Sequence, residues 1–396
     1  MRQHPFRFVI ACGIAALLFY ALALTAPFLG LSAYGRMQMA NIETGPMQLA
    51  QQGYNLVGFL VLAVTVILPG VKIGLLLVTL VGLKMRLVSR RLLKGLFRWY
   101  SAITPWAMVD VYLLGFLVAY TRLMAIAAVH LDTALYALIG LIVSMAAADA
   151  AMDTEAVWRA LDVAETKADE RHARPQHSVR SPPGNTSGLI GCHRCDRVNW
   201  AAPGQRCRRC DTVLHVRKAN SLGRSWALLV AGGIFFLPAN IYPVMVMTEL
   251  AVQRPYTIMG GIRDLLAAGL WPLAALVFFA SITIPLLKLV TLGYMLVQTQ
   301  TGSTKHLIGR TRAFRVIEFI GRWSMIDVFV LSLLVALVRF GQFANFVAQI
   351  GAPCFAAVVV LTMFAVEAFD PRLMWDACAS PRPEHKASSV AAEVRA

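Results

Sequence analysis

The sequence predicts an all-α integral membrane protein. It has eight transmembrane helices in two parallel four-helix repeats, with one small cytoplasmic zinc ribbon between them. Three observations predict this fold. The chain is 58% hydrophobic and only 15% charged, whereas a soluble domain has about 25% charged residues. It contains eight apolar runs long enough to cross a hydrocarbon core of about 30 Å. Finally, the membrane motifs of its first half return in its second half.

The eight apolar runs fall four to each half of the chain. We predict membrane spans at residues 8–29, 56–83, 101–121, 133–152, 225–248, 269–297, 321–340 and 352–369. The first run follows basic residues, as the apolar region of a signal peptide does, but it is longer than such a region. Because its counterpart at 225–248 is internal, we expect the first run to be a retained helix.

The duplication is visible in short motifs. Pro69 and Lys72 return as Pro285 and Lys288, 216 residues later. Each proline lies inside a predicted span, where it removes a backbone hydrogen bond and permits a kink. Because each repeat has an even number of spans, the two repeats have the same orientation, and the axis that relates them runs along the membrane normal.

Charged residues inside two neighbouring spans of each half form candidate pairs, Lys72 with Asp110 and Lys288 with Asp327. At a rise of about 1.5 Å per residue, each partner of the first pair lies about 15–18 Å from the basic end of its span. Two interpretations stay open. Each pair either fixes helix register as a neutralised ion pair, or contains a group that titrates or that contacts a lipid headgroup or coupling ion.

Three further features lie near helix ends. Pro238 and Pro243 stand close together at the outer end of the fifth span, where we expect the helix to break. We expect Asp149 and Glu367, at the ends of the fourth and eighth spans, to be solvated charges.

The distribution of basic residues predicts the orientation. They gather between the second and third spans and between the sixth and seventh: Lys84, Arg86, Arg90, Arg91, Lys94, Arg98, Lys305, Arg310, Arg312 and Arg315. The positive-inside rule therefore places both termini and the central segment in the cytoplasm. The net charge of +16 is explained by topology and contact with anionic headgroups, so no nucleic-acid partner is expected.

The central segment contains two CxxC pairs, Cys192 with Cys195 and Cys207 with Cys210. Four thiolates at this spacing are typical of a closed, structural Zn²⁺ site. The module is too short for a core of its own, so metal binding would supply most of its folding free energy. The alternatives are two disulfides, which a cytoplasmic location disfavours, or a redox dithiol pair.

These features divide the chain into five parts. We predict a first membrane repeat without an N-terminal ribbon, a charged and then flexible linker, the zinc ribbon, a second membrane repeat and a cytoplasmic tail, at residues 1–153, 154–188, 189–218, 219–371 and 372–396.

The ribbon motif, the run Leu237-Pro238-Ala239-Asn240-Ile241-Tyr242-Pro243, Pro285 with Lys288, and Trp323-Ser324-Met325-Ile326-Asp327-Val328 together resemble the paraquat-inducible protein A family. The resemblance is strong over residues 189–376 and weaker over 8–153. It implies a multi-pass protein of the bacterial inner membrane that works beside periplasmic MCE-domain proteins, whose tunnels carry lipid between the inner and outer membranes. The family typically has two ribbons, whereas no CxxC pair precedes the first span here.

The resemblance implies that the protein loads or removes phospholipid for a periplasmic MCE-domain tunnel protein. Two alternatives stay open: a proton- or ion-coupled exporter of small amphiphiles, and a non-transporting zinc-dependent membrane scaffold or regulator. No phosphate-binding loop of the GxxxxGK[ST] type occurs, so any energy for transport comes from elsewhere. No catalytic triad, acid pair or open metal site stands out, so an enzyme is not expected.

Overall fold

The computed structural model describes residues 4–33, 36–85, 88–123, 128–169, 188–218, 220–249, 252–337 and 344–379. In these ranges eight helices are long and apolar enough to cross a membrane, which confirms the predicted number. The third and seventh spans begin earlier than predicted, at Arg90 and Leu307. The basic segments before them, which we placed outside the predicted spans, are helical, and the membrane helices continue from them.

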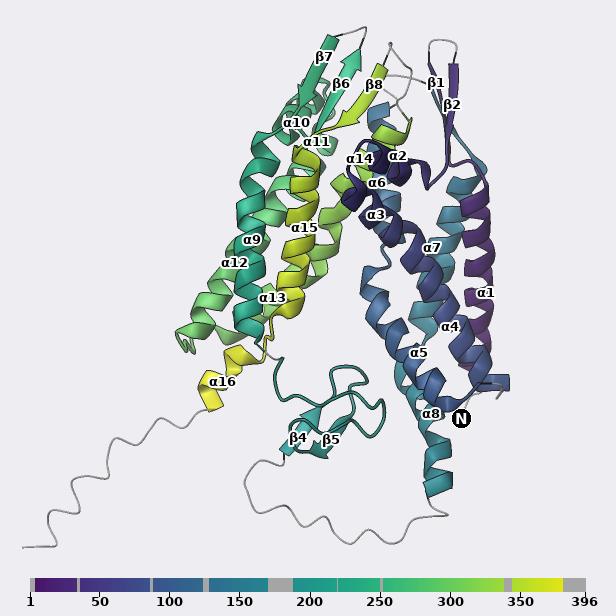
Figure 1. The fold of residues 1–396 in the computed structure, drawn as a ribbon, viewed down its shortest axis with the longest axis vertical. Coiled ribbons are helices and arrows are strands. Elements are labelled where there is room, and N and C mark those ends of the chain that lie inside the picture. Colours follow the sequence, from purple (N-terminus) through teal and green to yellow (C-terminus); the bar gives the residue numbers. More distant parts are fainter. Residues whose placement is uncertain are drawn as a thin grey trace, which may run out of the picture.

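The chain forms two sets of helices joined by a small central module (Figure 1). The first half contains α1 (His4–Thr25), β1 (Leu29–Ala33), β2 (Arg36–Ala40), α2 (Thr44–Gln51), α3 (Asn55–Leu62), η1 (Ala63–Ile67), α4 (Leu68–Met85), α5 (Arg90–Ile103), η2 (Thr104–Trp106), α6 (Val109–Leu123), β3 (Ala128–Leu131), α7 (Thr133–Ala151) and α8 (Thr154–Asp169). The module contains β4 (Gly188–Gly191) and β5 (Val198–Ala201).

The second half contains α9 (Ser221–Ile241), β6 (Met245–Glu249), β7 (Val252–Tyr256), α10 (Ile258–Ala267), α11 (Trp271–Phe278), η3 (Phe279–Thr283), α12 (Ile284–Gln300), α13 (Leu307–Gly321), η4 (Arg322–Met325), α14 (Ile326–Leu337), β8 (Ala344–Ala348), α15 (Gly351–Ala368) and α16 (Leu373–Ala379). The elements of the two halves come in the same order. In both, a π-helical segment interrupts the second span and a 3₁₀ turn interrupts the third.

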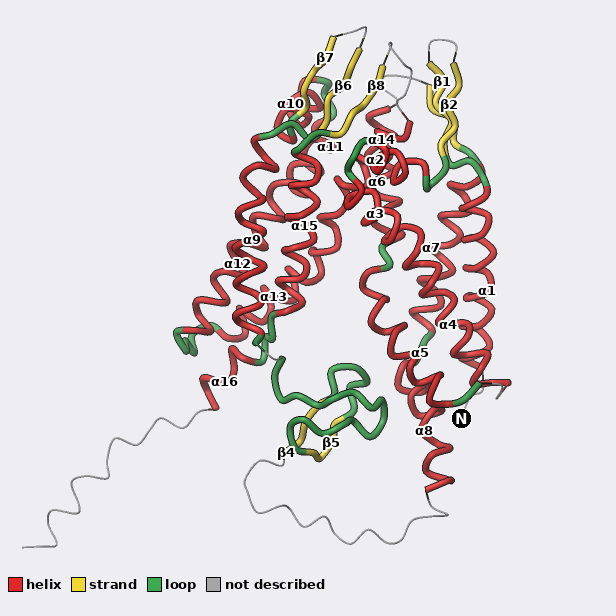
Figure 2. The backbone as a smooth tube through the Cα atoms, viewed as in Figure 1, coloured by secondary structure: helices red, strands yellow, loops and turns green. Residues whose placement is uncertain are grey.

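The helices separate two ends of the molecule. At the hairpin end, two antiparallel three-stranded sheets have the orders β2-β1-β3 and β7-β6-β8. At the other end, called here the cysteine end, lie α8, α16 and the two-stranded sheet of β4 and β5 (Figure 2). The two hairpin-end sheets were not expected from the sequence, because their strands are far shorter than a membrane span.

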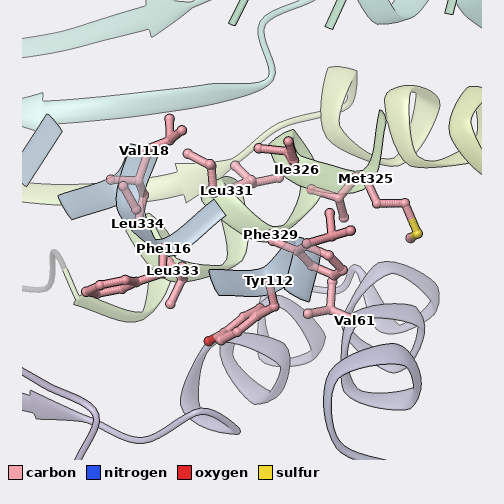
Figure 3. Packing of buried hydrophobic residues seen from close by; sticks show 14 of the residues in the cluster. Val61, Tyr112, Phe116, Val118, Met325, Ile326, Phe329, Leu331, Leu333 and Leu334 are labelled. Atoms are coloured by element: carbon pink, nitrogen blue, oxygen red, sulfur yellow. The ribbon is translucent and has the colours of Figure 1, made fainter. Parts of the chain in front are cut away.

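The two halves share one core near the hairpin end, built where α6 packs against α14 (Figure 3). Tyr112 and Phe329 meet there edge to face with ring centroids 5.6 Å apart. Gly115 permits the close approach, because a Cβ atom at this position would lie 3.0 Å from Cβ of Phe329. Toward the cysteine end each half has a separate core instead, and the two halves diverge (Figure 1).

We expect Gly115→Val to destabilise the joint between the halves, because the added atoms would overlap Phe329 on α14. Overpacking of this kind costs about 1–3 kcal/mol. The check is the thermal unfolding midpoint of the purified protein in one detergent. The control is Gly95→Val, a helical position where an added Cβ meets nothing within 4 Å; an equal loss in both variants would contradict the proposed contact.

Candidate transport cavity and metal-binding module

A cavity of about 710 Å³ lies between the halves, in their cysteine-end portion. The first half contributes the turn η2, and the second half contributes α12, α13, α15 and the residues that flank its spans. The lining residues are Thr104, Pro105, Trp106, Lys218, Lys288, Phe314, Arg315, Ile317, Glu318, Phe319, Gly321, Met363, Val366, Glu367, Phe369 and Pro371. The volume lies in the range of small-molecule binding sites, about 300–1,000 Å³.

Lys288 is the most deeply placed charge of this cavity. The residue is only 2% exposed, and its Nζ donates to the carbonyl of Gly321 at 2.9 Å and to Oγ of Ser324 at 2.8 Å. An ammonium group has three donors, so one remains beyond these two described bonds, and both of these partners are neutral. A lysine ammonium group that is buried in a largely apolar wall is stabilised when an anionic group binds beside it.

The cysteine-end mouth of the cavity carries charges of both signs. Lys218, Arg315, Glu318 and Glu367 line it and are exposed. The Nζ of Lys218 donates to the backbone carbonyl of Glu367. The mouth is thus polar and mixed in charge, whereas most of the inner wall is apolar.

Two aromatic residues that the sequence analysis did not select connect the halves beside this cavity. Trp106 of η2 packs on Phe364 of α15 with ring centroids 4.9 Å apart. Trp106 also lines the cavity. No sequence signal marks this role, because an aromatic ring near a span end is equally typical of an anchor at the membrane interface.

The prediction that Lys72 pairs with Asp110 is wrong. Nζ of Lys72 contacts Oδ2 of Asp149 at 2.7 Å, and the hydroxyl of Tyr100 donates to Oδ1 of the same aspartate at 2.9 Å. Asp110 is exposed. Depth in the membrane alone suggested the pair, but depth does not say which way a residue faces around its helix. Asp149 is therefore a lysine partner and not merely a solvated helix-end charge. The side chain of Asp327 lies outside the described part of the structure.

The four prolines predicted as kinks occupy two kinds of position. Pro69 and Pro285 are each the second residue of a helix that directly follows a π segment, so the irregular turn precedes the proline. Pro238 lies inside α9, which ends at Ile241, and Pro243 lies just beyond that end. The structure thus ends the helix near the predicted break.

The four cysteines of the module converge. Their Sγ atoms all lie within 4.8 Å of one another, and all four residues are buried. Sγ of Cys192 is 3.5 Å from that of Cys210, and Sγ of Cys195 is 3.6 Å from that of Cys207. A disulfide has a sulfur separation of about 2.05 Å, whereas four sulfurs about 2.3 Å from a tetrahedral metal ion lie about 3.8 Å apart. The cluster could therefore hold a metal ion.

The backbone presents each cysteine pair in the same way. The amide of Asp196 donates to the carbonyl of Cys192 at 3.0 Å, and the amide of Asp211 donates to that of Cys207 at 2.9 Å. Both aspartates have positive φ, 54° and 60°, a conformation that short polar side chains tolerate. Burial raises the pKa of the Cys192 thiol. A metal ion would favour its thiolate, which is the ligand form.

The module contacts both halves at the cysteine end. Arg209 donates to Glu155 at 3.1 and 3.2 Å and to Asp162 at 2.9 Å, both on α8. Arg217, at its other end, donates to Asp376 of α16 through Nε at 2.8 Å. These hydrogen bonds hold the pKa values of Glu155 and Asp376 below their usual range. The module therefore links α8 to α16.

We expect Arg209→Met to release the module from α8, since charge-assisted bidentate contacts are the stronger class of hydrogen bond. The measurement is protease cleavage between β5 and α9, which should become at least about tenfold faster, the effect of roughly 1.4 kcal/mol. Arg206→Met is the matched control, because Arg206 is exposed and pairs with Asp211 inside the module. Cleavage that is equally fast in both variants would contradict docking through Arg209.

Acid should weaken the contacts of Arg209 with Glu155 and of Arg217 with Asp376. A carboxyl group with a depressed folded-state pKa contributes stability above its unfolded pKa and loses it as the pH falls through the folded value. Glu155 and Asp376 both belong to this case. Cleavage between β5 and α9 by an acid-tolerant protease should therefore accelerate below about pH 4 in the native protein. The acceleration should be smaller in Arg209→Met, which already lacks the contact with Glu155. An unchanged rate down to about pH 2 would contradict this expectation.

Eight apolar spans and a cavity lined by both halves define a multi-pass membrane protein. The chain belongs to the paraquat-inducible protein A family, whose family description matches residues 7–162 and 222–379. The four-cysteine module falls between these two ranges.

Among curated relatives, the chain is 33% identical to the "Intermembrane transport protein PqiA" of Escherichia coli (strain K12), over 98% of this chain and 89% of that protein. It is 28% identical to the "Lipophilic envelope-spanning tunnel protein A" of the same strain, over 93% and 81%. It is also 27% identical to a "Probable intermembrane transport protein" of Haemophilus influenzae, over 91% and 84%. No solved structure is significantly similar. These names support an intermembrane transport role and point to a transport component rather than an enzyme.

Proposed function

We propose that this protein is the inner-membrane component of an intermembrane lipid transport system, and that it loads or removes phospholipid for a periplasmic MCE-domain tunnel protein. The observation that carries the proposal is the cavity between the halves with Lys288 buried in its wall. A phospholipid has the matching chemistry, since its phosphate suits the ammonium group and its acyl chains suit the apolar lining.

The orientation of the protein is part of the proposal. Basic residues gather at the cysteine end, on α5 and α13, so the positive-inside rule supports a cytoplasmic location for this end and for both termini. The hairpin end then faces the periplasm, where its two sheets are available to a partner. The cavity consequently lies in the cytoplasmic half of the inner membrane.

We further propose that the domains are those expected from the sequence. Two parallel repeats, at 1–153 and 219–371, are supported by the shared order of elements and by a family match in each half. The module at 189–218 would be a ribbon that holds one structural Zn²⁺ through Cys192, Cys195, Cys207 and Cys210, and its sulfur spacing supports this. The linker at 154–188 begins with α8, and the tail at 372–396 begins with α16.

A photo-crosslinking residue at two matched positions tests lipid binding. Met363 lines the cavity, whereas Leu18 on α1 is 67% exposed and faces outward. After extraction in detergent, phospholipid should crosslink at position 363 and not at 18, and Lys288→Met should lower the yield at position 363 by about tenfold or more. Equal yields at the two positions, or a yield independent of Lys288, would overturn the proposal.

The proposed contact with an MCE-domain partner at the hairpin end has its own test. Cysteines placed at hairpin-end strand positions such as Met39, which is 58% exposed, should crosslink to a large periplasmic protein in native membranes. Cysteines at the cysteine end, for example in place of the exposed Arg206, should not. Crosslinks of that protein at the cysteine end would reverse the proposed orientation.

A further inference from the structure

The second spans of the two halves contain the same irregularity. The π segments η1 and η3 precede Pro69 and Pro285 at the same 216-residue offset. A π segment inserts one extra residue into a helix, and proline cannot donate to the carbonyl one turn before it. Each turn therefore has carbonyl groups with fewer backbone donors, and each is a place where the helix can bend.

In the first half a side chain from a neighbouring helix closes this turn. The hydroxyl of Tyr20 on α1 donates to the carbonyl of Val66, inside η1, at 2.9 Å. Gly70 makes room for it, because a Cβ atom there would lie 2.6 Å from the Tyr20 hydroxyl oxygen. The bond joins α1 directly to the irregular turn.

Among the described residues, no tyrosine hydroxyl closes the corresponding turn of the second half. At the same offset, Tyr20 corresponds to Phe236 on α9, and Gly70 corresponds to Leu286. Phe236 is partly buried and packs on the same core, so the ring is retained and the hydroxyl is lost. Phenylalanine has no group that could donate to the carbonyl of Ile282, the counterpart of Val66.

The polar partners of the two corresponding lysines, Lys72 and Lys288, also differ between the halves. One turn after η1, Lys72 forms an ion pair with Asp149 on α7, which Tyr100 on α5 also contacts. One turn after η3, the described partners of Lys288 are a backbone carbonyl and a serine hydroxyl. The span of η1 and α4 is thus held by the Tyr20 bond from α1 and by an ion pair to α7. Lys288 joins α12 to α13 and η4 through hydrogen bonds to neutral groups.

We propose that the second half is the moving half of the protein: α12 bends about η3, whereas α4 is clamped at η1 by Tyr20. Because Lys288 lies only five residues beyond η3, bending of α12 would move it relative to η2 across the cavity. The proposal concerns the mechanics of the fold and does not depend on which ligand the cavity takes.

Backbone hydrogen exchange of the full-length protein in nanodiscs tests the clamp without any transport assay. Amides of residues 279–289 should exchange about two- to tenfold faster than those of 63–73, the range given by the net strength of one hydrogen bond. Tyr20→Phe should raise exchange in 63–73 by a similar factor. Phe236→Tyr should lower exchange in 279–289, because it returns a hydroxyl to the position that corresponds to Tyr20.

Phe235→Tyr is the control for the last variant, since residue 235 is 40% exposed and adds the same hydroxyl one position away. It should leave exchange in 279–289 unchanged. Equal exchange in the two native segments, or no effect of Tyr20→Phe on residues 63–73, would overturn the proposal even where Phe236→Tyr fails to place its hydroxyl.

Discussion

Replacing Cys192 and Cys195 with serine is expected to unfold the module between β4 and α9. The proposed metal site would lose two of four ligands, and in a module this small metal binding would supply most of the folding free energy, about 10–16 kcal/mol in zinc-finger peptides. Metal analysis should show about one equivalent of zinc in the native protein and almost none in the variant, if one closed site is present.

The same double variant should also release the module from α8 and α16, because the bonds of Arg209 and Arg217 depend on its folded shape. Protease cleavage within residues 188–218 reports this release. The control is a double serine variant of Cys12 and Cys354, which are not part of the cluster. A native protein with no bound metal and a protease-resistant module would contradict the zinc proposal, as would retention of zinc by the double variant.

Lys288→Met is expected to reduce lipid binding and Lys72→Met to reduce stability, although the two lysines occupy corresponding positions. Lys288→Met removes a buried cation whose described partners are neutral, so the free energy of unfolding should change by less than about 1 kcal/mol. Its proposed phosphate contact would be lost, which lowers the amount of bound phospholipid by about tenfold or more.

Lys72→Met should instead destabilise the protein by about 1–3 kcal/mol and leave lipid binding nearly unchanged. It leaves the carboxylate of Asp149, about 40% exposed, without its cation, and this exposure reduces the cost below that of a fully buried pair. Bound phospholipid per protein and the thermal midpoint, measured on the same samples, separate the two effects. Parallel behaviour of the two variants would argue against a special role for Lys288.

The sequence supported the membrane architecture well, because the number of spans depends on apolar length, which is a local property. Even so, the third and seventh spans begin earlier than expected, since α5 and α13 carry charges that interrupt the hydropathy signal while the helix continues. The convergence of the four cysteines was also predictable, because the spacing of two CxxC pairs along the chain determines which side chains can meet.

The contacts of the buried charges were not predictable in the same way. Lys72 and Asp149 are far apart in sequence, and their meeting depends on how α4 and α7 face each other. The cavity exists because the two halves diverge toward the cysteine end. The packing of α6 against α14 depends on the contact between Gly115 and Phe329. Tyr20 gave no signal at all, since a tyrosine in an apolar helix has the same pattern whether or not its hydroxyl has a backbone partner.

The shared core at the hairpin end also determines whether the two halves can be produced as separate proteins. The face of α6 that packs on α14 is apolar and includes Tyr112 and Phe116. Either half produced alone would present this face to the surrounding lipid or detergent and would lack half of its packing partners. We therefore expect separately expressed halves to associate with each other or with a second copy of themselves.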